Sequence, residues 1–328
     1  MIQLNRRQLV LSTTVLAFGL AAGSALAQGT SSAPLRVILP VGAGSGVDTI
    51  VRAAQNALSK ALGGQPVVIE NLPGSGGIIG TSALVKAAPD GKTIAFVSNN
   101  HAVNPSVFKK MPYDNLADIT PITVVGETPF VLVVNPVRLP VKNAKELQAA
   151  LKAKPDFYNY ASSGNGTIIH LAAEMFIDAA DVKARHIPYK GMGPMITDLI
   201  GGQVDFGVAA LPAVQGQLKA GTLRAIGITG DARVPSMPDL PTIKEQGLPD
   251  MSVGGWFAAI GPAKMPPAEV KRLHTAIVAA WASPEVKEAM AKQENLIHPS
   301  TPEAAAAFFK TEQARYGKLV QKADIKLD

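Results

Sequence analysis

The sequence predicts an α/β fold built as two modules, and three observations support this. Strand-like and helix-like segments alternate from residue 36 to residue 229, and glycine-rich turns repeatedly separate a strand from the next helix. A long apolar stretch from Ile119 to Val134 interrupts the alternation, which suits a strand pair passing between two modules. With 328 residues, 47% of them hydrophobic and 17% charged, the chain can bury a large core.

The N-terminus has the pattern of a secretory signal peptide. Arg6 and Arg7 precede an apolar run from Leu9 to Ala22, and Ala25-Leu26-Ala27 follows as a cleavage site. The run is shorter than the roughly 20 residues that span a bilayer. We therefore expect residues 1–27 to be removed and the mature chain to be periplasmic. The arginine pair leaves twin-arginine and general secretory export both open.

The first module begins with a strand, a glycine-rich loop and an amphipathic helix. Apolar residues recur at helical spacing in that helix, and Gly63-Gly64 ends it. The expected elements are strands at 36–41, 66–70 and 93–98, a helix at 47–62 and a helix ending near 86.

The second module begins with a helix that Asn143 can cap. Glu146 stands three residues later, which is a capping-box spacing, and Ala144, Leu147 and Leu151 form the expected inner face. The elements expected after it are strands at 158–162, 186–189, 204–209 and 223–229, and helices at 168–180, 195–200 and 211–219.

The C-terminal part is expected to supply helices and almost no strands. A proline-rich stretch follows Arg233, and helices should start near Pro267, Pro284 and Pro302. We expect this part to pack on the first module. The predicted division is lobe 1 at 28–128 plus 233–328 and lobe 2 at 129–232, so the chain passes twice between the lobes.

Composition excludes several classes of function. Cysteine is absent, which removes disulfides, thiolate catalysis and Cys-based metal sites. The formal net charge is +6, and loss of the two arginines of the signal peptide leaves +4. The basic residues are scattered and aromatic residues make up only 5%, so no nucleic-acid partner is expected.

Glycine and serine occur where a strand gives way to a helix at three places, 42–46, 74–77 and 163–167. The N-terminus of a helix exposes unpaired N–H groups and a positive dipole end, and glycine lets a ligand approach the backbone. Glycine also simply permits tight turns. Because the pattern occurs in both modules, it favours a cleft that binds an anion such as a carboxylate. Asp48, in the first turn of the first helix, is expected to stabilise the dipole or brace the loop.

Motifs for catalysis are incomplete. A dinucleotide fingerprint would need glycine where Val47 stands, a phosphate loop ending at Lys92-Thr93 would need glycine where Lys86 stands, and no Gly-x-Ser-x-Gly elbow occurs. The five histidines lack metal-ligand spacing, and only His101 is expected near a cleft. A binding protein without metal or cofactor is therefore favoured over an enzyme, with an exported nucleotide-dependent oxidoreductase as the alternative.

Several segments together resemble the Bug-type solute receptors of tripartite tricarboxylate transporters. The resemblance covers nearly the whole mature chain. It is carried by residues 68–77 (VIENLPGSGG), 87–93 (AAPDGKT), 101–105 (HAVNP), 160–166 (YASSGNG), 187–191 (IPYKG) and 201–205 (GGQVD). It implies a type II periplasmic-binding-protein fold, with two α/β lobes joined by a two-strand hinge, and delivery of a ligand to a membrane permease.

The resemblance also implies ligand-binding loops and partners. With the neighbouring positions, the predicted binding residues are Val41, Gly42, Ala43, Gly44, Ser45, Ser98, Asn99, His101, Ser163, Gly164, Asn165, Gly166, Thr167, Ala209 and Ala210. The first loop departs from the Pro-Pro-Gly-Gly usual in the family, and two small alanines replace a usually polar position. We therefore expect a monomer that binds an organic acid, dicarboxylic or with an apolar or aromatic body. A receptor for a sensor kinase is a further alternative.

Overall fold

The elements of the chain form two separate sheets. The computed structural model describes residues 33–249, 251 and 253–322, so the predicted signal peptide lies outside the described residues. Contacts divide the chain into residues 1–33 and residues 34–328, and every helix and strand given below lies in the second of these units.

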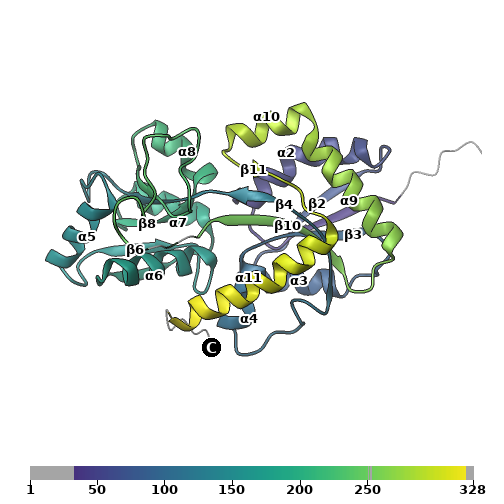
Figure 1. Cartoon of the computed structure of the whole chain (residues 1–328), viewed down its shortest axis with the longest axis horizontal. Helices are drawn as coiled ribbons and strands as arrows, with labels where there is room; N and C mark the ends of the chain where they lie inside the picture. Colours follow the sequence, from purple (N-terminus) through teal and green to yellow (C-terminus); the bar gives the residue numbers. More distant parts are fainter. Residues whose placement is uncertain (1–32, 250, 252, 323–328) are drawn as a thin grey trace, which may run out of the picture. The chain divides into compact units, whose positions relative to one another are not determined.

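The first sheet has six strands in the order β11-β4-β10-β3-β1-β2 (Figure 1). β1, β2 and β3 are parallel, whereas β10 is antiparallel to both β3 and β4. Strands at the N-terminal and C-terminal ends of the chain thus share one sheet. Their bounds are β1 Leu35–Leu39, β2 Val67–Asn71, β3 Thr93–Ser98, β4 Ile119–Thr128, β10 Gly255–Pro262 and β11 Leu296–Ile297.

Helices cover both faces of this sheet. Successive side chains of β1 point to opposite faces, and apolar ones on each face pack against helices. Leu35, Val37 and Leu39 pack into a cluster with α2 and the helices α9 and α10, whereas Ile38 packs into the cluster on the opposite face with α4 and α11. Figure 1 shows the two groups on opposite sides of the strands. Their bounds are α2 Gly46–Ala61, η1 Ser75–Gly77, α3 Ile78–Val85, α4 Asn100–Val107, α9 Pro267–Ala282, α10 Pro284–Lys292 and α11 Pro302–Lys322.

The second sheet has five strands in the order β7-β6-β8-β5-β9. β6 is parallel to β7 and β8, and β5 is antiparallel to β8 and β9. The predicted cap of its first helix is confirmed, because the Glu146 N–H donates to Asn143 Oδ1 at 2.8 Å. The bounds are β5 Phe130–Val134, β6 Asn159–Ser162, β7 Arg185–Pro188, β8 Phe206–Ala210, β9 Arg224–Ile228, α5 Ala144–Ala153, α6 Ile168–Ala180, α7 Met192–Ile200 and α8 Leu211–Lys219.

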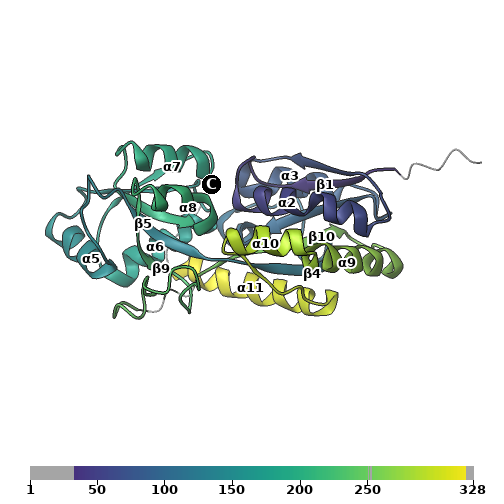
Figure 2. The same cartoon turned by 90° about the horizontal axis from the view of Figure 1, so that it is seen from above.

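Two neighbouring segments connect the sheets. Pro129 alone separates β4 from β5, and Gly255, at the start of β10, lies opposite Thr128. Figures 1 and 2 both show β4 and β10 side by side. A methyl group on Gly255 would lie 2.6 Å from Phe130 Cε1, so the two segments pack backbone against ring at this point. The predicted α/β class with two modules and a two-strand connection is confirmed.

Two expectations about local structure were wrong. The C-terminal part supplies β10, which is buried along its whole length in the middle of the first sheet, and the short strand β11. The sequence of β10, GWFAAIGP, is rich in glycine and alanine. Polar and apolar residues do not alternate in it, because both faces of the strand are covered. The second wrong expectation is a loop at 98–101, because Asn100 and His101 begin α4, which runs to Val107 with Pro105 inside it.

None of the helices in the described part of the chain combines the length and apolar character needed to cross a membrane.

Candidate functional site

The first predicted loop, Val41 to Gly46, is held by a buried carboxylate. Asp48 Oδ2 accepts from the Gly44 N–H at 2.9 Å, and its Oδ1 accepts from Arg52 Nε at 2.8 Å. Burial raises the pKa of Asp48, but these hydrogen bonds outweigh it, so the pKa lies below its ordinary value and the group stays charged. Asp48 therefore braces the loop, one of the two roles that the sequence suggested.

The loop itself is open to a ligand. Residues 42–44 are exposed, and methyl groups built on Gly42 and Gly44 would meet nothing within 4 Å. Gly44 has a φ of +77°, a conformation that favours glycine. Ser45 begins α2 as its N-cap and accepts from the Asp48 N–H, so the loop lies directly before the positive end of a 16-residue helix.

The second predicted loop, Ser163 to Thr167, lies before α6 in the other module. Thr167 is the N-cap, accepting from the His170 N–H, and its hydroxyl donates to the Gly164 carbonyl at 2.8 Å. Ser163 Oγ donates to Thr167 Oγ1 at 3.1 Å, and Asn165 is exposed. This loop therefore has a hydrogen-bonded hydroxyl pair and an exposed polar side chain at the start of a 13-residue helix.

The two modules approach each other at these loops. Asn100 Oδ1, at the start of α4, accepts from the Ile168 N–H, at the start of α6, at 2.8 Å. A methyl group on Gly46 would lie 4.0 Å from Ala210 Cβ. Ala209 and Ala210, which end β8, are buried. The predicted positions of both modules therefore converge on one region.

Some of the predicted binding residues of the first module line a cavity of about 10 Å³, which has room for about one water molecule. Val41, Ser98 and His101 line it. It is also lined by Gly76 and Gly77 of the second glycine cluster and by residues outside the predictions, Pro40, Thr81, Val97, Asn100 and Asn104. The second glycine cluster, at 74–77, thus lines the same cavity as Val41, which precedes the first cluster.

The side chains of Asn99 and His101 point into the module. Asn99 Nδ2 donates to the Gly254 carbonyl and to Tyr316 Oη, and Asn99 Oδ1 accepts from the Trp256 N–H. His101 Nε2 bonds the Asn115 carbonyl at 2.9 Å, and burial lowers the pKa of His101 to about 4 although that bond raises it. These two side chains fix the start of α4. Their contact with a ligand remains a prediction.

Sequence reasoning missed a cluster beneath the second loop. His170 and His186 are stacked with ring centroids 3.8 Å apart, and Tyr160 and Glu174 adjoin them. The histidines are far apart in sequence and come together only because β7 pairs with β6 next to α6. The described residues contain no group of three or more acidic and histidine side chains placed to hold a metal ion.

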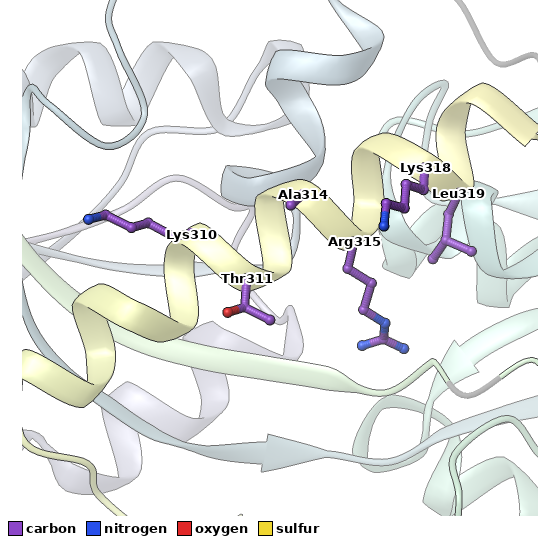
Figure 3. Close-up of a pocket in the computed structure, with 6 residues that line it drawn as sticks. All are labelled: Lys310, Thr311, Ala314, Arg315, Lys318 and Leu319. Atoms are coloured by element: carbon purple, nitrogen blue, oxygen red, sulfur yellow. The ribbon is translucent and has the colours of Figure 1, made fainter.

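Another hollow on the described surface lies elsewhere. It measures about 620 Å³ and is lined by Lys310, Thr311, Ala314, Arg315, Lys318 and Leu319, all on α11. Figure 3 shows these side chains along one helix. It contains no residue of either predicted loop, so its size alone does not make it the site.

Comparison with known proteins decides between the classes that the sequence left open. The profile of the tripartite tricarboxylate transporter family receptors matches residues 50–325. The chain belongs to this receptor family. It is therefore a solute-binding receptor, and the family is one of periplasmic receptors rather than enzymes. The match begins at residue 50, after the loop at 41–46.

Individual relatives of this tripartite tricarboxylate receptor agree in sequence and in fold. BugT of Bordetella pertussis is 35% identical over 296 residues, covering 90% of each chain. The solved periplasmic binding protein BugD is 31% identical with a TM-score of 0.85, covering 90% of this chain and 99% of BugD. Rpa4515 of R. palustris, solved with adipate, is 30% identical with a TM-score of 0.86, covering 91% of this chain and 100% of Rpa4515. These likenesses match the two-sheet α/β fold.

Proposed function

We propose that this receptor holds a small organic carboxylate between the loops at 41–46 and 163–167 and passes it to the membrane subunits of a tripartite tricarboxylate transporter. It acts in the periplasm, after cleavage of its signal peptide behind Ala27, without catalysing a reaction. The observation that carries the proposal is the contact of Asn100 Oδ1 with the Ile168 N–H, which brings the starts of α4 and α6 together.

The chemistry of the loops suits a carboxylate. Each loop leads into a helix N-terminus, where partial positive charge favours an anion. The Ile168 N–H already donates to a side-chain oxygen, so an oxygen ligand fits that position. Ser163 and Thr167 lie beside it, and the Ser163 hydroxyl, which now donates to Thr167 Oγ1, could turn to donate to a ligand instead. Rpa4515, which shares the fold, was solved with the dicarboxylate adipate, and this supports an organic acid as the ligand class.

The alanines at the end of β8 suggest the shape of the ligand. Ala210, the last residue of β8, presents a small apolar side chain where the modules approach, and Ala209 precedes it. A methyl group adds no hydrogen-bond partner, so an apolar body fits here better than a second charged group. We therefore expect an apolar or aromatic acid, or a dicarboxylate with a methylene chain, to bind better than a compact amino-acid-like dicarboxylate.

A titration of the mature chain tests the proposal. Adipate, benzoate and aspartate would be compared by calorimetry with adipamide, which has the length of adipate without its charge, and with NAD. A carboxylate at about 100 times its dissociation constant should raise the unfolding free energy by about 2.7 kcal/mol. Binding of adipamide as tight as that of adipate, or binding of NAD alone, would contradict it.

A further inference from the structure

The stacked histidines lie directly beneath the second loop. His170 comes from α6 and His186 from β7, and their rings are nearly parallel, 3.8 Å apart with an interplanar angle of 9°. Tyr160 stacks on His186 at 4.9 Å on the same sheet. Neither histidine belongs to the residues predicted to bind ligand, yet both are linked to the glycines of that loop.

His170 is fixed on both ring nitrogens. Its Nδ1 accepts from the Gly166 N–H at 3.1 Å, so the proton of the neutral ring must lie on Nε2. Nε2 lies 3.5 Å from Glu174 Oε1, which also accepts from the Tyr160 hydroxyl. The backbone of Gly166, which has a φ of +70°, is therefore connected through His170 to a partly buried carboxylate.

His186 reaches the same loop through a hydroxyl. Its Nε2 lies 2.6 Å from Ser162 Oγ. Ser162 Oγ in turn bonds both the N–H and the carbonyl of Gly164 at 3.2 Å. Gly164 has a φ of +135°, which side chains rarely adopt. Hydrogen bonds thus link Gly166 directly to His170, and Gly164 to His186 through the Ser162 hydroxyl.

We propose that His170 is a positioning residue for the loop at 163–167, and that protonation of the stacked pair disorders the loop and weakens ligand binding. The second part rests on the proposed function, whereas the first concerns the loop with or without ligand. A proton on Nδ1 would turn the acceptor of the Gly166 N–H into a donor. Two donors would then face each other, and the loop would lose that attachment.

Few charged groups face the pair. Glu174 approaches from α6, and the uncharged Tyr160 and Ser162 approach from β6. On β7 the side chain of Arg185 donates to the Asp156 carbonyl. Burial and the neighbouring His170 lower the pKa of His186 to about 4, and Glu174 only partly opposes this. His186 is therefore neutral near pH 7, and strong acid would charge it.

Two variants separate positioning from packing. His170→Asn keeps an acceptor oxygen at the place of Nδ1 and cannot titrate, whereas His170→Phe keeps an aromatic ring and removes the acceptor. His274→Asn is the control, because His274 bonds the Ser300 carbonyl from α9 in the first module. The readouts are hydrogen-exchange protection of the Gly166 amide in the ligand-free chain and calorimetric affinity for adipate, each from about pH 8 to about pH 4.

In the wild-type chain and the control, Gly166 protection and adipate affinity should both fall at least ~10-fold as the pH drops, since that amide loses its acceptor. H170F should show the low protection at every pH, and H170N should keep the high protection with a flat pH profile. If H170F does not fold, the profile of H170N decides alone.

Equal Gly166 protection in H170F and wild type, or a pH profile in H170N as steep as in wild type, would overturn the proposal. Failure of the wild-type chain to bind any carboxylate would contradict the proposed function and the affinity part of this inference. In that case the hydrogen-exchange protection of the Gly166 amide alone would decide whether His170 positions the loop.

Discussion

Asn100 and Ile168 are joined by a 2.8 Å hydrogen bond that runs from a side-chain oxygen in one α/β module to the first amide of a helix in the other. The oxygen occupies the position where the helix dipole and the free N–H favour an anion. Asn100 thus both holds the modules together and occupies a place suited to a carboxylate.

Asn100→Asp should lower carboxylate affinity more than Asn100→Ala. The new carboxylate would remain near the Ile168 N–H and add a negative charge where the ligand's charge is expected. We expect a loss of about 1–3 kcal/mol in binding free energy for the aspartate and a smaller change for the alanine. Calorimetry with adipate at low and high salt checks this, and equal effects of the two variants would contradict it.

Asp48→Asn should weaken the first loop. Asp48 Oδ2 accepts the Gly44 N–H and Oδ1 accepts Arg52, and an amide nitrogen in either place would face a donor. We expect the unfolding free energy to fall by about 1–3 kcal/mol. Urea unfolding of the mature chain measures this. An unchanged midpoint with an unchanged slope would show that Asp48 does not brace the loop.

The stability of the chain should fall in mild acid because of His101. Its pKa is about 4 in the folded chain, below its ordinary value of 6.5, so between these values the unfolded state binds more protons. The unfolding free energy should therefore drop as the pH falls through this window, by about 3 kcal/mol at most for this residue. His101→Gln, which can still donate to the Asn115 carbonyl, should flatten that part of the profile. Parallel profiles in urea unfolding would contradict this origin.

Gly255→Ala should destabilise the connection between the sheets, whereas Gly216→Ala should not. The added methyl group at Gly255 would lie 2.6 Å from Phe130 Cε1, but at Gly216, inside α8, it would meet nothing within 4 Å. We expect a loss of about 1–3 kcal/mol at Gly255 and a gain of up to ~1 kcal/mol at Gly216. Thermal unfolding of both variants checks the pair.

Most of the fold could be predicted because its signals are local. The helix that begins after Asn143 can be predicted from its capping residue and the spacing of its apolar residues, which lie within a few positions of one another. β10 could not be predicted, because its Gly and Ala residues become strand only between β3 and β4. The same applies to α4, whose Asn99 is fixed by Tyr316 from the far end of the chain.

The predicted site, too, could be found from the sequence only where its signals are local. Its glycine loops follow from the strand-to-helix pattern, and both lie where the modules meet. The stacking of His170 on His186 depends on strand order, which no spacing in the sequence contains.

The absence of cysteine in this chain allows a direct test of the central claim. Gly46→Cys with Ala210→Cys would place two Cβ atoms about 4.0 Å apart, a distance that suits a disulfide. Oxidation should lock the loop regions together, so adipate binding measured by calorimetry should be lost in the oxidised form and restored by reduction. Equal affinity in the two forms, with the disulfide confirmed by mass spectrometry, would show that the ligand does not enter between the loops.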